Sequence, residues 1–170
     1  MGNVIEFRNI TKYFPGVKAL DDISFTANGG EVLALMGENG AGKSTLLKVL
    51  NGDYQQTSGE YLVNGEPCHF NSPREAVAAG IGVIYQERQI MLELTVGENI
   101  FLGRLPTGFM GRIKMREVHS RAQAIIDEFG LDMKSTDKVK DLSVAYQQMV
   151  EIMKAYSREN LKMIAFDEPT

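Results

Sequence analysis

The sequence contains one cysteine, Cys68, and only two histidines, His69 and His119. A single cysteine excludes an internal disulfide, and these three side chains are too few for a zinc-type cluster. We therefore expect the chain to work in a reducing, cytosolic setting.

Long apolar runs are absent as well. The first residues, MGNVIEFRNITKYF, lack the apolar segment of a signal peptide, and no stretch approaches the ~20 apolar residues of a membrane span. Internal repeats and low-complexity tracts are also missing. With 170 residues, 44% of them hydrophobic, the composition predicts one globular domain with a single core.

An excess of positive charge is the third absence. The chain has 18 Lys and Arg against 22 Asp and Glu, which gives a formal net charge of −4. A broad basic field of the kind that holds nucleic acid is therefore not expected, although the net charge is compatible with a local basic patch.

The first third of the chain has the pattern of strands. The segments VIEFRNI and DISFTA alternate apolar and polar residues, as half-buried strands do. The segment EVLALM (31–36), after the turn NGG, is almost continuously apolar, which predicts a buried strand. Further on we expect a helix over KSTLLKVLN, a hairpin at Asn64–Gly65, a short helix after Ser72–Pro73 and a buried strand IGVIY.

Residues 88–157 have mainly helical periodicity. Two segments, KMREVHSRAQAIIDEFG and SVAYQQMVEIMKAYS, are amphipathic, and Gly130 marks the end of the first. In the second, Met149, Ile152 and Met153 fall on one face, which we assign to the core.

The segment GENGAGKST, directly after EVLALM, fits the phosphate-loop pattern G-x-x-x-x-G-K-[ST]. Glycines let successive N–H groups point inward, and the following helix adds its positive N-terminal end. A glycine-rich turn with a solvated lysine is the alternative, but a chance match in this context is rare. The predicted phosphate-binding residues are Gly37, Asn39, Gly40, Ala41, Gly42, Lys43, Ser44 and Thr45, with Lys43 on the β- and γ-phosphates and Ser44 on Mg²⁺.

The segment KMIAFDEPT (162–170) has the pattern of a strand that delivers two carboxylates, Asp167 and Glu168, to its C-terminal end. A core strand capped by a polar turn, with Pro169 blocking a helix, would give the same letters. A phosphate loop calls for an acid at the end of a distant apolar strand, and Asp167 is the candidate that would hold its magnesium.

Further motifs follow in order: Gln86 after IGVIY, then TVGENIFLG, LSVAYQQMVEI and IAFDEPT. They resemble the Q-loop, signature and Walker B segments of ATP-binding-cassette (ABC) ATPases. The strings FPGVKALDDISF, GENGAGKSTLLKVLNGDY, SPREAVAAGIGVIYQE and LTVGENIFLGR resemble in particular the first ATPase half of monosaccharide importers of the ribose, galactose, xylose and arabinose type.

The resemblance implies an α/β fold: a P-loop NTPase core with an antiparallel β subdomain and a helical subdomain. It divides the chain into an ATP-binding core and β subdomain (1–85), a Q-loop and helical subdomain (86–157) and a Walker B strand (158–170). It also implies that the sheet is truncated after that strand.

Residue roles follow from the resemblance. Phe14 would stack on adenine, a contact worth ~1–3 kcal/mol, with Tyr13 as the alternative. Gln86 would sense Mg²⁺ and the attacking water, Asp167 would hold Mg²⁺ through water, and Glu168 would polarise the attacking water.

The signature departs from the superfamily's usual Leu-Ser-Gly-Gly-Gln, because residues 142–146 are LSVAY. Ser143 and the helix N-terminus keep their anion donors for a γ-phosphate across a dimer. Val144 and Ala145 carry Cβ atoms where close backbone approach is usual, and we expect them to weaken that contact.

The implied function is ATP binding and hydrolysis, with Mg²⁺, that powers monosaccharide import. The implied partners are transmembrane permease subunits, a second ATPase cassette and, indirectly, a periplasmic or extracellular sugar-binding protein. The implied location is peripheral, at the cytoplasmic face of the plasma membrane. Two alternatives are an ABC-type ATPase that acts on nucleic acid, and a noncatalytic module that merely holds nucleotide.

The sequence also suggests that the stop at Thr170 is a truncation. In ATPases of this kind another strand, later in the chain, separates the phosphate-loop strand from the Walker B strand, and the family's D-loop and switch histidine also follow Walker B. His69 and His119 both precede Glu168, so we expect no turnover by these residues alone. Because an unpaired buried backbone group costs about 1–3 kcal/mol, we expect no empty slot in the sheet. Instead, the last strand would move beside residues 31–36, a second copy would pair there in a homodimer or domain swap, or residues beyond about 157 would be displaced.

Overall fold

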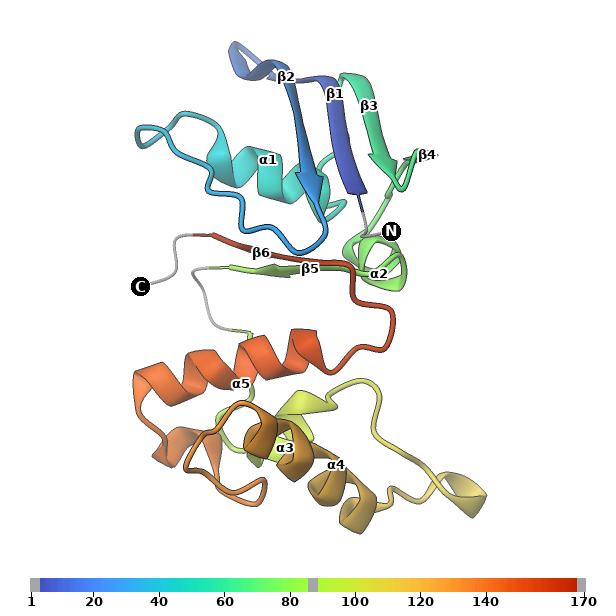
Figure 1. Cartoon of the computed structure of the whole chain (residues 1–170), viewed down its shortest axis with the longest axis vertical. Coiled ribbons are helices and arrows are strands. Elements are labelled where there is room, and N and C mark those ends of the chain that lie inside the picture. The colour runs from blue at the N-terminus through green and yellow to red at the C-terminus, as the bar shows by residue number, and fades with distance from the viewer. Residues whose placement is uncertain (1–3, 86–88, 168–170) are drawn as a thin grey trace. The chain divides into compact units, whose positions relative to one another are not determined.

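The computed structural model describes residues 4–85 and 89–167, which form two compact units (Figure 1). Unit 1 comprises the described residues up to 83 together with those from 160 onward, and unit 2 comprises the described residues from 84 to 159. Each unit has its own hydrophobic core. The prediction of a single core is therefore wrong, because the apolar faces of the unit 2 helices pack against one another.

Unit 1 is built on a four-stranded antiparallel sheet in the order β2-β1-β3-β4. Its strands are β1 (Val4–Phe14), β2 (Val17–Asn28), β3 (Ser58–Val63) and β4 (Glu66–Cys68). The hairpin predicted at Asn64–Gly65 is confirmed, since it joins β3 to β4 and both residues have positive φ, 55° and 80°.

Helix α1 (Lys43–Leu50) supplies the other side of the unit 1 core. Its leucines at 46, 47 and 50 are buried in one cluster with Ile5 and Phe7 of β1. Helix α2 (Pro73–Ala78) begins after Ser72, whose hydroxyl accepts a hydrogen bond from the Glu75 N–H. A separate two-stranded sheet pairs β5 (Ile81–Ile84) with β6 (Met163–Phe166).

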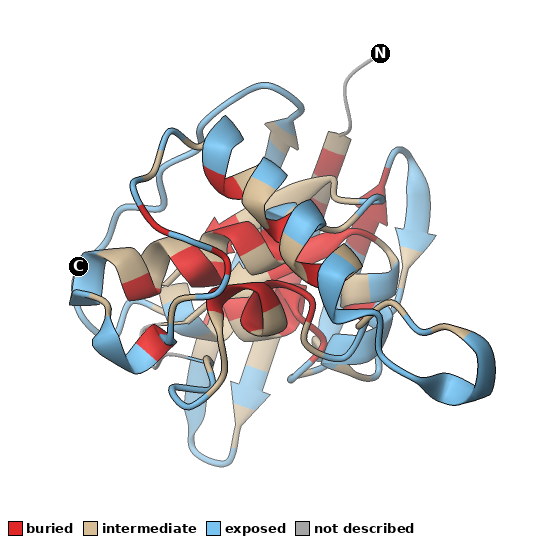
Figure 2. Cartoon of the chain, turned by 90° about the horizontal axis from the view of Figure 1, so that it is seen from below, coloured by how far each residue is buried: buried red, intermediate tan, exposed pale blue. Residues whose placement is uncertain are grey.

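Unit 2 contains α3 (Val96–Ile100), the 3₁₀ turn η1 (Phe109–Gly111), α4 (Met115–Glu128), η2 (Val139–Asp141) and α5 (Val144–Tyr156). The buried residues of its helices meet in the second core cluster (Figure 2). Met153 is fully buried and Met149 packs against the cluster, as predicted, whereas Ile152 is only half-buried.

The buried strand predicted for EVLALM is wrong. Residues 31–36 carry no strand assignment, and all six are exposed, Val32 and Met36 almost completely. An apolar run becomes a buried strand where neighbouring strands pair with it and other elements cover both faces of the sheet. Among the residues that the structure describes, no strand pairs with this segment, and its side chains stay exposed.

A cavity of about 570 Å³ separates this segment from β6 within unit 1. Apolar side chains dominate its walls, including Phe7, Phe25 and Leu47. The expectation that β6 would move in beside residues 31–36 is wrong, since β6 pairs with β5. The gap that we expected to be too costly is present, because the penalty applies to buried polar groups and residues 31–36 are exposed.

We expect the chain to self-associate through the segment 31–36, which borders the cavity beside β6. Val32 and Met36 present apolar side chains on a segment with open backbone groups, a combination that favours edge pairing. The sedimentation coefficient of the chain should rise with concentration, and Val32→Lys with Met36→Lys should suppress the rise. Val17→Lys, on an exposed residue of β2, is the matched control. A concentration-independent monomer would contradict the expectation.

Candidate functional site

The phosphate loop is shaped by two glycines with left-handed backbone. Gly40 has φ +84° and Gly42 has φ +90°, conformations that cost other residues roughly 1–2 kcal/mol. Gly42 is also the N-cap of α1, and the Leu46 N–H donates to its carbonyl oxygen at 2.8 Å. A Cβ atom on Gly42 would lie 2.5 Å from the Ala19 carbonyl oxygen and 2.9 Å from Leu20 Cδ2. Only glycine lets the start of α1 approach β2 this closely.

Lys43 closes the loop onto itself. Its ammonium donates hydrogen bonds to the carbonyl oxygens of Gly37 at 2.8 Å and Glu38 at 3.0 Å. Because these carbonyls precede the glycine turn, the lysine head lies over the loop. This is the position from which a cation can neutralise phosphates held by the loop N–H groups.

Ser44 and Asp167 are brought together from distant parts of the chain. The Ser44 hydroxyl donates to Asp167 Oδ1 at 3.0 Å. Ser44 stands in the first turn of α1, and Asp167 follows the last residue of β6. A hydroxyl and a carboxylate are oxygen ligands that suit Mg²⁺, which is usually held by one or two carboxylates together with substrate phosphates.

Phe14 lies at the end of β1 in an aromatic cluster. Its ring meets the ring of Tyr54 edge to face, with centroids 5.2 Å apart, and the Lys12 ammonium lies 5.1 Å from the Phe14 centroid. The alternative, Tyr13, is 49% exposed and has Lys18 over its ring. Tyr54 and Lys12 were not expected from the sequence. Lys12 could have been, because residues two apart on a strand share a face.

Ser143 is the N-cap of α5, and its hydroxyl accepts from the Tyr146 N–H at 3.4 Å. Residues 143–145 are all exposed, so the N-terminal end of the helix is open to solvent. Gln86 and Glu168, the remaining predicted site residues, lie outside the described residues.

Two charged residues of α5 hold the segment that follows Gln86 along the chain. The buried Glu151 carboxylate accepts from the Gln89 N–H, and the Lys154 ammonium donates to the Gln89 carbonyl oxygen at 3.0 Å. Burial lowers the pKa of Lys154. The apolar periodicity that predicts α5 does not reveal this pair, because Glu151 and Lys154 bind backbone groups of a residue far away in the sequence.

Comparisons with known proteins identify the family of the chain. The family model "ABC transporter" matches residues 20–170. The chain is 51% identical over 170 residues to "Arabinose import ATP-binding protein AraG 1" of Burkholderia ambifaria, and 52% identical over 166 residues to AraG of Vibrio parahaemolyticus. These alignments cover 100% and 98% of this chain but only 33% and 32% of the relatives. The chain thus spans about a third of their length.

Solved structures give the same class. A nucleotide-free ATP-binding cassette from an ABC transporter superposes with a TM-score of 0.80 at 29% identity, over 99% of this chain and 70% of that one. The ADP conformation of another ATP-binding cassette of an ABC transporter gives a TM-score of 0.78 at 28% identity, over 96% of this chain and 68% of that one. The fold is that of an ATP-binding cassette, and the chain belongs to the ABC transporter family. Among the residues described, no helix is long and apolar enough to cross a membrane.

The two glycines of the loop allow a matched pair of substitutions. Gly42→Ala should lower the free energy of unfolding by roughly 2–4 kcal/mol, since it adds left-handed strain and a collision with the backbone of β2. Gly40→Ala adds the same strain in open space and should cost about 1–2 kcal/mol. Thermal unfolding followed by circular dichroism, without nucleotide, measures both. Equal losses would show that the approach to Ala19 matters little.

Proposed function

We propose that this chain binds Mg-ATP and forms part of an ATPase that powers monosaccharide import. The observation that carries the proposal is the Ser44–Asp167 hydrogen bond beside the closed phosphate loop. It joins a hydroxyl and a carboxylate at the place where the loop would present phosphates. The 51% identity to arabinose-import ATP-binding proteins favours a pentose or a similar sugar as the cargo.

The residues of the loop fit a polyphosphate. Gly40 and Gly42 supply the left-handed backbone that curls the loop, and the N-terminal end of α1 is favourable for anions. Lys43 would exchange the Gly37 and Glu38 carbonyls for phosphate oxygens, which are stronger acceptors because they are charged. Phe14, held on edge by Tyr54, would offer a ring face to the base.

The magnesium role falls to Ser44 and Asp167, with Gln86 as a further ligand by family resemblance. Bound Mg-ATP supplies the phosphoanhydride bond whose hydrolysis drives transport. By the family resemblance, Glu168 would polarise the attacking water and accept its proton. This role requires the carboxylate to lie within hydrogen-bond reach of that water.

Hydrolysis is proposed to need two cassettes face to face. The open N-terminal end of α5 at Ser143 is available to the γ-phosphate of a facing cassette. Permease subunits would be the membrane partners, and a sugar-binding protein outside the membrane would deliver the solute. The cassette itself would sit at the cytoplasmic face and never touch the sugar.

The rival function, an ATPase that acts on nucleic acid, has less support. The net charge is −4, and the similar curated proteins are importers. A salt-sensitive shift of DNA or RNA in a gel, at low protein concentration, would favour the rival instead.

The first expectation concerns binding. Lys43→Ala should weaken Mg-ATP binding about 10-fold or more, because a charge-assisted hydrogen bond contributes roughly 1.5–3 kcal/mol. Asp167→Asn should weaken binding in Mg²⁺ but leave binding in EDTA nearly unchanged. Isothermal titration calorimetry measures both, with Lys134→Ala as the control on an exposed lysine. Unchanged affinity in Lys43→Ala would refute the phosphate-loop assignment.

The second expectation concerns turnover. The 170-residue chain should bind ATP but hydrolyse it negligibly, since Ser143 is proposed to act only across a pair of cassettes. In the longer protein assembled with its permease, Glu168→Gln should abolish phosphate release while ATP binding persists. Robust turnover by the 170-residue chain, lost in Glu168→Gln, would overturn the proposed need for two cassettes.

A further inference from the structure

Unit 2 carries a projecting loop, residues 106–114, that the nucleotide site does not use. We call this loop the basic finger. Its two arms meet at an isolated bridge between Thr107 and Ile113, and the Lys114 N–H donates to the Pro106 carbonyl oxygen at 2.9 Å. Near the tip, the Gly108 N–H donates to the Arg112 carbonyl oxygen at 2.8 Å. The finger is therefore an ordered element whose base, through the neighbouring Leu105, packs against the unit 2 core.

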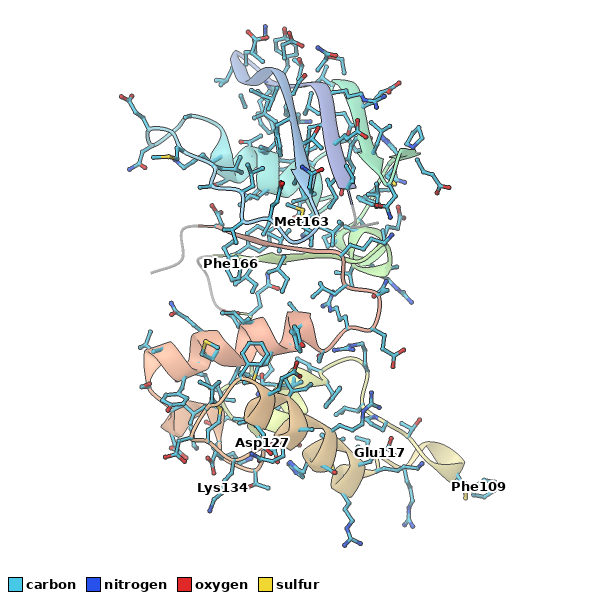
Figure 3. The ribbon with its side chains drawn as sticks, in the orientation of Figure 1. Phe109, Glu117, Asp127, Lys134, Met163 and Phe166 are labelled. Atoms are coloured by element: carbon cyan, nitrogen blue, oxygen red, sulfur yellow. The ribbon has the colours of Figure 1, made fainter. Side chains whose placement is uncertain are left out.

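The tip of the basic finger is apolar and exposed. Phe109 is 90% and Met110 is 86% exposed, and Phe109 points away from α4 at the far end of the loop (Figure 3). Met110 has a positive φ of 60°, a conformation that side chains other than Asn and Asp rarely adopt. The backbone thus accepts local strain in a turn that exposes two large apolar side chains.

Cations follow this tip along the chain. Arg112, Lys114 and Arg116 are all exposed, and residues 99–116 contain no Asp or Glu. The nearest acid that follows is Glu117, whose carboxylate lies 3.5 Å from the Lys114 ammonium and 3.8 Å from the Arg121 guanidinium. One carboxylate shared by two cations leaves the finger and its base with net positive charge.

We propose that the basic finger docks on an anionic lipid surface, with Phe109 and Met110 at the boundary between headgroups and acyl chains, and with Arg112 and the adjoining Arg116 of α4 on lipid phosphates. The order of the side chains matches a bilayer interface, where apolar groups enter first and cations stay at the depth of the phosphates. A bilayer also admits a narrow tip without a preformed pocket. A protein pocket for this tip is the competing occupant, because Phe, Met and Arg are also enriched in the cores of protein interfaces.

The proposal does not rest on nucleotide binding, because none of the finger residues belongs to the phosphate loop or to the Ser44–Asp167 pair. Its test can therefore fail while the proposed ATPase function stands. Loss of Mg-ATP binding in Lys43→Ala would likewise leave the finger unaffected.

The chain contains no tryptophan, so a single introduced one reports on its own surroundings. Phe109→Trp should show a blue-shifted emission with vesicles of phosphatidylcholine and phosphatidylglycerol, and no shift with phosphatidylcholine alone. Added salt should reverse the shift, because attraction between exposed charges is screened. Val17→Trp, at a residue 59% exposed in unit 1, is the control that should not shift.

The role of the basic residues is tested in the Phe109→Trp variant. Arg112→Glu with Arg116→Glu should reduce vesicle binding about 10-fold or more, because each basic residue near an anionic surface contributes to the attraction. Lys134→Glu, an exposed lysine of unit 2 outside the finger, should leave binding within about 2-fold. Far-ultraviolet circular dichroism confirms that each variant is folded.

Three outcomes would overturn the proposal. They are an unshifted Phe109→Trp emission in anionic vesicles, an equal shift in Val17→Trp, and unchanged binding in the doubly reversed variant. A shift that occurs only with detergent-solubilised permease, and with no protein-free vesicle, would assign the tip to a protein pocket instead.

Discussion

The approach of Gly42 to the backbone of β2 is the constraint on which the candidate site depends. The Ala19 carbonyl oxygen occupies the space that a side chain at Gly42 would need, so the first turn of α1 is fixed against the sheet. Lys43 and Ser44 follow directly on that turn, and their directions are fixed with it. Ser44 then reaches Asp167, 123 residues further along the chain, and ties the end of β6 to the same place. The missing side chain at Gly42 thus allows the contacts that bring a hydroxyl and a carboxylate together from two distant segments.

Elements decided by a few consecutive residues could be predicted from the sequence. The hairpin at Asn64–Gly65 needs only two residues that accept positive φ, and α2 needs only Ser72 and Pro73 at its start. Residues 31–36 could not be predicted in this way. Their apolar composition is that of a buried strand, but burial depends on partners at both edges, and no pattern within the segment reveals those partners.

In the candidate site, too, some contacts could be predicted from the sequence and others could not. Ser44 and Asp167 could be paired from chemistry, because a phosphate loop calls for an acid at the end of an apolar strand, and the structure brings them within 3.0 Å. Tyr54 follows Phe14 by 40 positions and carries no motif, so only the packing of the segment after α1 against the end of β1 reveals their contact. The roles of Glu151 and Lys154 could not be predicted either. Both side chains bind backbone groups of Gln89. Nearly every residue has the same backbone N–H and C=O groups, so the sequence does not show which of them a side chain will bind.

The net charge of the chain does not show how the charges are distributed over its surface. A net charge of −4 disfavours a broad basic field, yet residues 99–116 contain no acid and include the basic finger. In physiological salt the interactions of exposed charges are largely screened beyond about 8 Å. Carboxylates elsewhere on the surface therefore do little to cancel the field at Arg112 and Arg116. What a surface attracts is decided by the charges within that distance, so one acidic protein can carry both a phosphate site and a separate surface for anionic lipid.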